Sequence, residues 1–396
     1  MATVNYPFDP FKEARCITHR HSPRLIAGLA MLSLGFFDGI LGVAWLAIHQ
    51  SIDTNIESIG VALALVGGGS ALGSAIAPLI LKSISHLALL KAALVTQCMI
   101  MLILGLSESL SVFAALYGIR GLANGLAHAS LNAFFAPRMS GSHLMNVHGG
   151  WGIGIASAGL MTGWILSQGL AWWIPYALGG LLTLIAVCSL WVSRRSLQDL
   201  GTHGTGDSSV FSGVSVPMIW AVLSGAVYVG LEQGVGNWIS VVMVAMHAVD
   251  AGFAGLATGL FWGALTFGRF TLGLIQMPER WILTGASVTV LISLACLPFA
   301  PAYGQMALYG LTGLAMAPIA PFILVIGARM VPASARDAML SIQIVGFSAG
   351  AAVIPAVFGV VATEFSIERV LVGFVSVACM LLIAVMATLN QQESTC

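Results

Sequence analysis

The strongest constraint on this chain is a series of long apolar stretches that recur along its whole length. A helix that crosses a bilayer needs about 20 mostly apolar residues, and the 396-residue chain contains twelve such stretches separated by short polar breaks. Hydrophobic residues make up 58% of the chain and charged residues only 8%, whereas soluble proteins carry about 25% charged residues. We therefore expect an all-α integral membrane protein with twelve transmembrane helices. They are predicted near residues 25–50, 58–82, 87–106, 111–136, 144–167, 172–193, 216–245, 251–275, 282–300, 303–330, 336–362 and 367–389.

The longest polar connection divides these predicted helices into two groups of six. Residues 194–215 are rich in Gly and Ser, a composition typical of a flexible linker between packed units. We expect an N-terminal six-helix bundle over residues 25–193 and a C-terminal six-helix bundle over residues 216–389. Residues 1–24 and 390–396 are then short tails.

The two halves repeat each other weakly. Shifting the second half onto the first pairs Gly35 with Gly230 and Gly39 with Gly234 in the first and seventh helices. The segment Tyr117–Ala123 of the fourth helix likewise matches Tyr309–Ala315 of the tenth. A parallel repeat of this kind predicts two pseudo-symmetric bundles related by an axis along the membrane normal, with a substrate site between them near the bilayer midplane. Glycines that recur only because small residues help helices to pack are the alternative explanation.

The positive charges predict the orientation. If the N-terminus is cytosolic, all but two of the 15 Lys and Arg residues lie in or near cytosolic segments, as expected when short basic loops stay inside. The exceptions are Arg120, deep within a span, and Arg369, in an outer loop. We therefore expect a multi-pass protein of the plasma (inner) membrane with both termini in the cytosol.

The composition and missing motifs exclude several classes of function. Fifteen basic residues balance 15 acidic residues, so no positive excess is available to bind nucleic acid. The chain has no GxxxxGK[ST], HExxH or GxSxG motif, and its six cysteines form no CxxC pair, which disfavours ATP hydrolysis and enzymatic catalysis. We expect no enzyme activity, no metal and no cofactor other than a proton gradient, and a monomer in the bilayer.

Ionisable residues are rare inside the predicted helices. Asp38, Arg120, His128 and Glu232 lie well within spans, where a charged group is costly and usually serves a function. Asp38 and Glu232 lie about midway along the first and seventh helices, so we expect both to face a central cavity. Desolvation makes a buried carboxyl easier to protonate, and a neighbouring cation reverses the effect. Asp38, Glu232 and His128 are therefore the candidate proton-coupling residues; a packing hydrogen bond, or an acid paired with Arg120, is the alternative.

The fourth helix carries a regular polar stripe. Arg120, Asn124, His128 and Asn132 recur every four residues, which places them on one helix face. Guanidinium and amide groups can donate several hydrogen bonds, and amides also accept them. Arg120, Asn124 and Asn132 are therefore candidates for binding a hydroxyl-rich solute. A set of polar contacts between helices is the alternative.

The seventh helix offers further polar groups. Gln233 and Asn237 lie among Gly234 and Gly236, and glycine weakens a helix and exposes its backbone. We expect Gln233 and Asn237 to bind the solute as well.

Three tryptophans are candidates for stacking on the apolar face of a sugar ring. Trp45 follows Asp38 by seven residues, or two helical turns, and is therefore expected on the same helix face. Trp238 lies beside the polar residues of the seventh helix, and Trp151 lies in the fifth. Packing in the core or at the membrane interface is the commoner role of tryptophan.

These residues resemble a known family. The chain is similar to the major facilitator superfamily, and within it to the fucose, galactose and glucose/mannose proton symporters. The resemblance implies two bundles that rock against each other. It also implies that acidic residues of the first and fourth helices take part in sugar recognition and proton coupling, and Asp38 is the residue that matches this pattern most directly. His128 stands where the group is expected to have a glutamate. The segments that carry the resemblance are Gly35–Gly39, Ala77–Lys82, Asn124–Gly125, His148–Gly149, Gly230–Glu232, Phe261–Gly263 and Gly268–Arg269.

The sequence thus predicts a secondary active transporter that moves a small hydroxyl-rich solute, a sugar, together with protons by alternating access. A proton-driven multidrug or organic-ion transporter is the alternative, since the acids or Arg120 could bind a charged substrate. A membrane sensor that does not transport is a further alternative from a different class.

Overall fold

The structure is a computed structural model that describes residues 21–135, 139, 141–193, 216–271, 277–332 and 335–395. Within these ranges the regular elements are all helices. The predicted linker 194–215 and most of the predicted N-terminal tail lie outside the described residues. The last helix continues through the predicted C-terminal tail as far as Thr395.

The helices follow the predicted apolar stretches one by one. In the first half they are α2 (His21–Asp38), α3 (Leu41–Ser51), α4 (Ile59–Ile80), α5 (His86–Ile103), α6 (Leu110–Phe135), α7 (Gly141–Ser167) and α8 (Ile174–Val192). In the second half they are α10 (Val216–His247), α11 (Ala251–Thr271), α12 (Glu279–Cys296), α13 (Ala302–Met316), α14 (Ile319–Arg329), α15 (Arg336–Glu364) and α16 (Glu368–Thr395).

Most of these helices are long and apolar enough to cross a membrane. Among the described residues ten helices meet that test, and the bent pair of α2 and α3 makes an eleventh. α7 fills the place of the fifth predicted span although it is not among the helices that meet that test. It packs against α2 on one side and α11 on the other, so much of its surface faces protein rather than lipid.

Two predicted spans are broken in the middle. The first bends by 43° between Asp38 and Leu41, where a Cβ on Gly39 would lie 2.2 Å from the carbonyl oxygen of Ile155; glycine is needed there for α7 to approach. The tenth span breaks between α13 and α14 at Pro318, since proline has no N–H to continue the helix. The first break changes which side chains share a face with Asp38.

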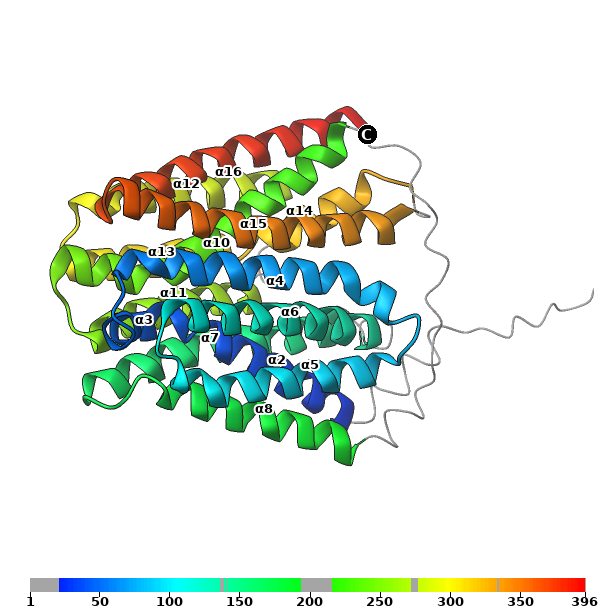
Figure 1. Ribbon diagram of the computed structural model, residues 1–396. Coiled ribbons are helices and arrows are strands. Elements are labelled where there is room, and N and C mark those ends of the chain that lie inside the picture. Colours follow the sequence, from blue (N-terminus) through cyan, green and yellow to red (C-terminus); the bar gives the residue numbers. More distant parts are fainter. Residues whose placement is uncertain are drawn as a thin grey trace, which may run out of the picture.

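The helix pairing shows the internal repeat. In the first bundle, α2 packs on α7, α4 on α6 and α5 on α8; in the second, the corresponding pairs are α10 with α15, α11 with α13 and α12 with α16. Each pair in one bundle therefore has its counterpart in the other. α2 begins and α16 ends at the same end of the molecule (Figure 1), called here the terminal end; the opposite end is the loop end.

The two bundles meet mainly along α7 with α11, α4 with α15, and α3 with α10, with a smaller contact of α3 with α11. Gly60 and Gly359 pack backbone to backbone, as a Cβ on either would lie 2.6 Å from the other's Cα. One apolar cluster combines buried side chains of both bundles, among them Trp45 and Trp238. Two other clusters, which lie toward the terminal end, each belong to a single bundle. Buried apolar side chains thus join the bundles toward the loop end, and toward the terminal end the contact of α7 with α11 continues to Gly149, where a Cβ would lie 2.2 Å from the ring of Phe270.

Candidate functional site

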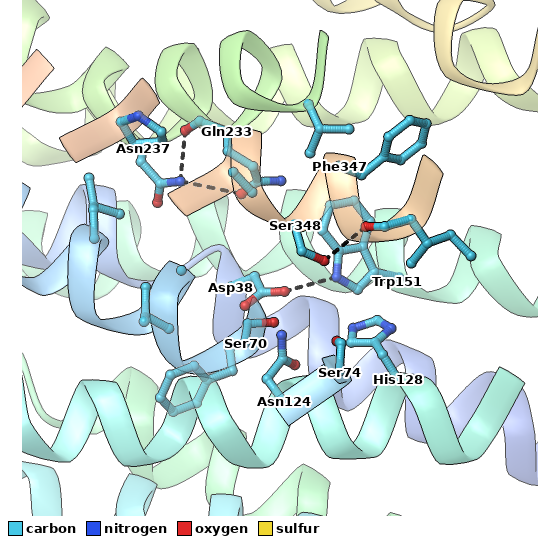
Figure 2. Close-up of a pocket in the computed structure, with 18 of the residues that line it drawn as sticks. Asp38, Ser70, Ser74, Asn124, His128, Trp151, Gln233, Asn237, Phe347 and Ser348 are labelled. Atoms are coloured by element: carbon cyan, nitrogen blue, oxygen red, sulfur yellow. Dashed lines mark hydrogen bonds between the residues drawn. The ribbon is translucent and has the colours of Figure 1, made fainter. Parts of the chain in front are cut away.

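A cavity of about 620 Å³ lies between the two bundles. Helices α2, α3, α4, α6 and α7 form its wall on the first bundle, and α10, α14 and α15 form its wall on the second (Figure 2). The side chains that line it are Phe37, Asp38, Leu41, Leu63, Val66, Gly67, Ser70, Ser74, Tyr117, Arg120, Asn124, His128, Asn132, His148, Trp151, Val229, Gln233, Asn237, Leu324, Leu340, Ile344, Phe347, Ser348, Ala351 and Pro355.

Asp38 is the acidic residue of this lining. One carboxylate oxygen, Oδ1, forms an ion pair with the guanidinium of Arg120, and the other, Oδ2, accepts a hydrogen bond from Nε1 of Trp151 at 2.9 Å. The Asp38 side chain is 16% exposed and that of Arg120 only 3%. The guanidinium carbon of Arg120 also lies 4.1 Å from the centre of the Phe37 ring, within the range of a cation–π contact. The two charges on this wall therefore neutralise each other.

The stripe expected on the fourth helix lies on α6 and faces the cavity. Arg120, Asn124, His128 and Asn132 all line it, in that order from mid-membrane toward the terminal end. Oδ1 of Asn132 lies 3.1 Å from Nε2 of His148 on α7. Asn124 is 8% exposed, and its Oδ1 has no hydrogen-bond partner among the described residues. A buried acceptor of this kind is available to a ligand.

Gln233 and Asn237 of α10 also line the cavity, on the wall opposite Asp38. Nδ2 of Asn237 donates to the backbone oxygen of Gln233 at 2.8 Å and lies 3.5 Å from its Oε1. α10 is one unbroken helix over this segment, so the two glycines do not interrupt it. The free hydrogen-bonding groups here are therefore side-chain amides.

The prediction that Glu232 faces the cavity is wrong. Its Oε2 accepts hydrogen bonds from Tyr228 and from Arg269 of α11, the latter at 2.9 Å, and its side chain is 5% exposed. The physical reason is the register of α10: neighbouring residues differ by about 100° around a helix, so Glu232 and Gln233 cannot face the same way. The shift that pairs Gly35 with Gly230 pairs Asp38 with Gln233 rather than with Glu232.

Trp45 and Trp238 also lie away from the cavity. Both are fully buried, and their indole nitrogens donate to the backbone oxygens of Ile56 and Pro355. Trp45 does not share a face with Asp38, because the chain bends between α2 and α3. Trp238 follows Asn237 by one residue and so points about 100° away from it. Neither is placed to stack on a solute in this cavity.

Trp151 has the expected position in the cavity wall. Besides its hydrogen bond to Asp38, its ring meets the ring of Trp262 on α11, with centroids 5.5 Å apart and planes at 88°. This is the edge-to-face geometry that aromatic pairs prefer. Trp151 thus touches the candidate proton site and the second bundle at once.

Several residues of the site were not among the sequence candidates. His148, Ser70 and Ser74 complete the polar wall, and Phe347 lines the cavity from α15. Arg269, assigned from the sequence to the basic loop side, lies in the last turn of α11 and neutralises Glu232. The sequence did contain a signal for Arg269, because Glu232 lies within a span and a buried acidic residue requires a cation nearby. The serines and Phe347 carry no comparable signal in a chain so rich in small and apolar residues.

The arrangement is suited to binding rather than to bond-breaking chemistry. The described residues contain no group of three or more His, Cys, Asp or Glu that could hold a metal ion. The cavity combines a neutralised ion pair, amides, imidazoles and hydroxyls with apolar walls. Such a lining can hold an uncharged polar molecule.

No protein-family model and no curated protein matches the chain. Solved structures match it over nearly its whole length. The peptide transporter POT in complex with sulfate gives a TM-score of 0.74 at 10% identity, and the match covers 98% of this chain and 99% of that chain. A mutant of the nucleoside transporter NupG gives a TM-score of 0.73 at 13% identity, covering 92% of this chain and 99% of that one. The D-xylose–proton symporter gives 0.71 at 14% identity, covering 93% and 96%. At these identities the likeness establishes the fold, which is that of the major facilitator transporters.

Proposed function

We propose that this protein is a secondary active transporter that carries a small, neutral, hydroxyl-rich solute together with protons. The observation that carries the proposal is the ion pair between Asp38 and Arg120 in the cavity wall, which also contains the unpaired amide oxygen of Asn124. Because the pair cancels its own charge, the wall favours an uncharged ligand. Its donors and acceptors suit hydroxyl groups, and we take hexoses as the probes of this class.

The ion pair provides a route for coupling proton and solute. While Asp38 is ionised, it holds N–H groups of Arg120. Protonation of Asp38 removes the charge that holds the guanidinium, and the freed N–H groups can then donate to oxygen atoms of a solute. A solute held by Arg120 in turn favours the protonated form of Asp38, since coupling between two binding events is reciprocal. Mutual stabilisation of this kind drives symport.

Glu232 has a different role in this proposal. Arg269 neutralises it and Tyr228 donates to it, away from the cavity. We therefore assign Glu232 to the packing of α10 on α11, and we assign proton exchange to Asp38 with His128 as a second titratable group on the same wall. Gln233, Asn237, Asn124 and Asn132 remain the proposed solute-binding amides, with Arg120 and Trp151.

The way the bundles meet supports alternating access as the transport mechanism in this proposal. The contacts of α3 with α10 and of Gly60 with Gly359 close the loop end, and the cavity extends toward the terminal end along α6. Rocking one bundle against the other about a central site is the known plan for parallel repeats. We propose that the terminal end is cytosolic, in the plasma membrane, so the described state faces the cytosol.

The competing transport functions have less support. A proton-driven exporter of cationic drugs needs a free negative charge, whereas Asp38 is neutralised by Arg120. An organic-anion carrier needs a free positive charge, and Arg120 is neutralised by the same contact. Either function requires the pair to open without a proton, which costs the Coulomb energy of a partly buried pair.

The test is transport in proteoliposomes with an inward pH gradient. Labelled D-glucose, D-galactose, D-mannose and L-fucose are supplied in turn, and internal label and external pH are recorded. We expect at least one hexose to accumulate and a protonophore to abolish the accumulation. Asp38→Asn should abolish accumulation yet keep exchange of internal for external hexose. Glu364→Gln, an exposed acid outside the cavity, is the control. Absence of hexose-dependent proton uptake across the panel rejects the proposal.

A further inference from the structure

The two walls of the cavity differ in chemistry. On the first bundle, polar side chains follow one another along α6 from Arg120 through Asn124 and His128 to Asn132, with His148 beside them on α7. At a rise of 1.5 Å per residue, the stripe extends over roughly 18 Å. Every residue of this stripe carries a nitrogen or oxygen that can bond to a solute.

The facing wall on the second bundle is apolar over the same depth. Leu340, Ile344 and Phe347 recur on one face of α15, and Leu324 of α14 lies beside them in the lining. Ile344 is 48% exposed. Figure 2 shows Phe347 on the opposite side of the cavity from Asn124, Ser74 and His128. An apolar side chain that stays exposed to a water-accessible cavity lacks the favourable free energy that its burial would contribute.

Some polar groups of the second wall are occupied within the protein. The hydroxyl of Ser348 donates to the backbone oxygen of Ile344 at 3.1 Å, and Nδ2 of Asn237 donates to the backbone of Gln233. On the first wall, by contrast, Oδ1 of Asn124 is buried without a partner. The first wall thus carries the longer series of polar side chains, and the second wall combines the amides of Gln233 and Asn237 with a series of apolar side chains.

The apolar wall does not suit the surface that faces it. If the bundles closed at the terminal end, Leu340 and Ile344 would be pressed toward the side of the cavity that carries His128 and Asn132. Burying those polar groups against aliphatic side chains costs free energy, because their hydrogen bonds to water are lost and none replaces them. A ligand that is apolar on one side and polar on the other removes this mismatch.

We propose that Leu324, Leu340, Ile344 and Phe347 form a subsite for an apolar substituent of the transported solute. The solute is then a neutral glycoside: a hydroxyl-rich ring against α6, with an aromatic or branched aliphatic group against α15. Phe347 is the residue that sets this preference, since it is the aromatic member of the set; its ring packs on α10, where a Cβ on Gly225 would lie 2.0 Å from Cε1, and it also lines the cavity. The inference rests on the proposed function and specifies its substrate class.

The first experiment compares each sugar with its own glycoside. Counterflow of labelled D-glucose and D-galactose is measured in proteoliposomes of the full-length protein, with the unlabelled hexose or its phenyl β-glycoside as competitor. Because the phenyl group would be buried against apolar side chains, we expect the glycoside to compete at a concentration at least tenfold lower than the hexose. Thermal unfolding of the purified protein with the same compounds should give the same order.

The second experiment changes Phe347 alone. Phe347→Asn places a polar group in the subsite and should reduce the advantage of the phenyl glycoside to less than threefold, while the hexose itself still exchanges. Phe347→Leu keeps the subsite apolar and should preserve most of the advantage. Val345→Ala is the matched control, since Val345 lies on α15, is 55% exposed and does not line the cavity.

The outcomes separate the subsite from the proposed function. If hexoses accumulate with protons but phenyl glycosides compete no better than hexoses, the subsite is wrong and the proposed function stands. If Phe347→Asn slows every compound equally and leaves their ratio unchanged, the apolar wall serves closure of the bundles and the subsite is again overturned. If neither hexoses nor glycosides exchange, the proposed function and the subsite both fail.

Discussion

The indole nitrogen of Trp151 donates a hydrogen bond to Oδ2 of Asp38 across 2.9 Å and so joins α7 to α2 beside the cavity. The same ring packs edge to face on Trp262 of α11, which in turn covers Gly236 of α10. A change of charge on Asp38 therefore acts directly on a side chain at the contact between the bundles. A single residue, Trp151, therefore links the carboxylate of Asp38, which we propose as the proton site, to the α7–α11 contact between the bundles.

Removing the donor of Trp151 should weaken coupling without emptying the site. Trp151→Phe keeps an aromatic ring against Trp262 but loses the hydrogen bond to Asp38, and such a bond to a charged group contributes about 2 kcal/mol. We expect proton-driven accumulation to fall about tenfold while exchange at equal pH stays within threefold. Trp164→Phe on the same helix, where Trp164 is 60% exposed, should change neither. An equal loss of both activities in Trp151→Phe would mean that the residue is only structural.

The pair of Asp38 and Arg120 should appear in a double-mutant cycle of stability. Arg120→Gln leaves a partly buried carboxylate without its cation, which costs about 3 kcal/mol. Adding Asp38→Asn removes the unpaired charge, so the double variant should unfold at a higher temperature than Arg120→Gln alone. Thermal unfolding of the purified protein measures this. Additive losses in the double variant would show that the two groups do not interact.

Glu232 and Asp38 should respond differently to neutralisation. Glu232→Gln leaves Arg269 without its counter-charge, so we expect a lower unfolding temperature, with a loss of about 2 kcal/mol. Because Glu232 does not line the cavity, the protein that remains folded should still accumulate solute with protons. Asp38→Asn should show the opposite pattern: exchange is kept and accumulation lost. If the folded Glu232→Gln variant loses proton-driven accumulation, Glu232 takes part in proton coupling and its assignment to packing is wrong.

The close approach of α4 and α15 can be tested with two neighbouring glycines. A Cβ on Gly67 would lie 2.4 Å from Cα of Ala352, whereas a Cβ on Gly68 meets nothing within 4 Å. Gly67→Ala should therefore force the bundles apart and slow transport at least tenfold. Gly68→Ala should leave transport unchanged and raise stability by about 0.5 kcal/mol, because alanine favours the helix. Both variants are compared by uptake rate and thermal unfolding.

Part of the site could have been read from the sequence more sharply. The stripe from Arg120 to Asn132 is fixed by helical periodicity alone, and all its members line the cavity. The internal repeat pairs Asp38 with Gln233, so it already contained the information that Gln233, and not Glu232, shares the position of Asp38. The prediction chose Glu232 instead of Gln233 because of its charge, but an acidic residue within a span can face either a cavity or a buried arginine.

Other features required the tertiary structure. The exclusion of Trp45 depends on the 43° bend after Asp38, which no proline announces and which reflects the packing of Gly39 against Ile155. The partnership of Glu232 with Arg269 and the apolar wall around Phe347 depend on how separate helices are rotated against each other. Apolar residues facing lipid, core and cavity look alike in sequence.

The amino-acid sequence by itself determined the membrane class, the order of the apolar helices, their repeat and the helix faces that are polar, because these depend on local hydropathy and on the 3.6-residue period. Only the tertiary structure decided which buried charges are paired with each other and which of them reach the cavity, and that its two walls differ. Those properties arise from contacts between helices distant in the chain, where a rotation of about 100°, one residue, moves a carboxylate from the cavity to an ion pair.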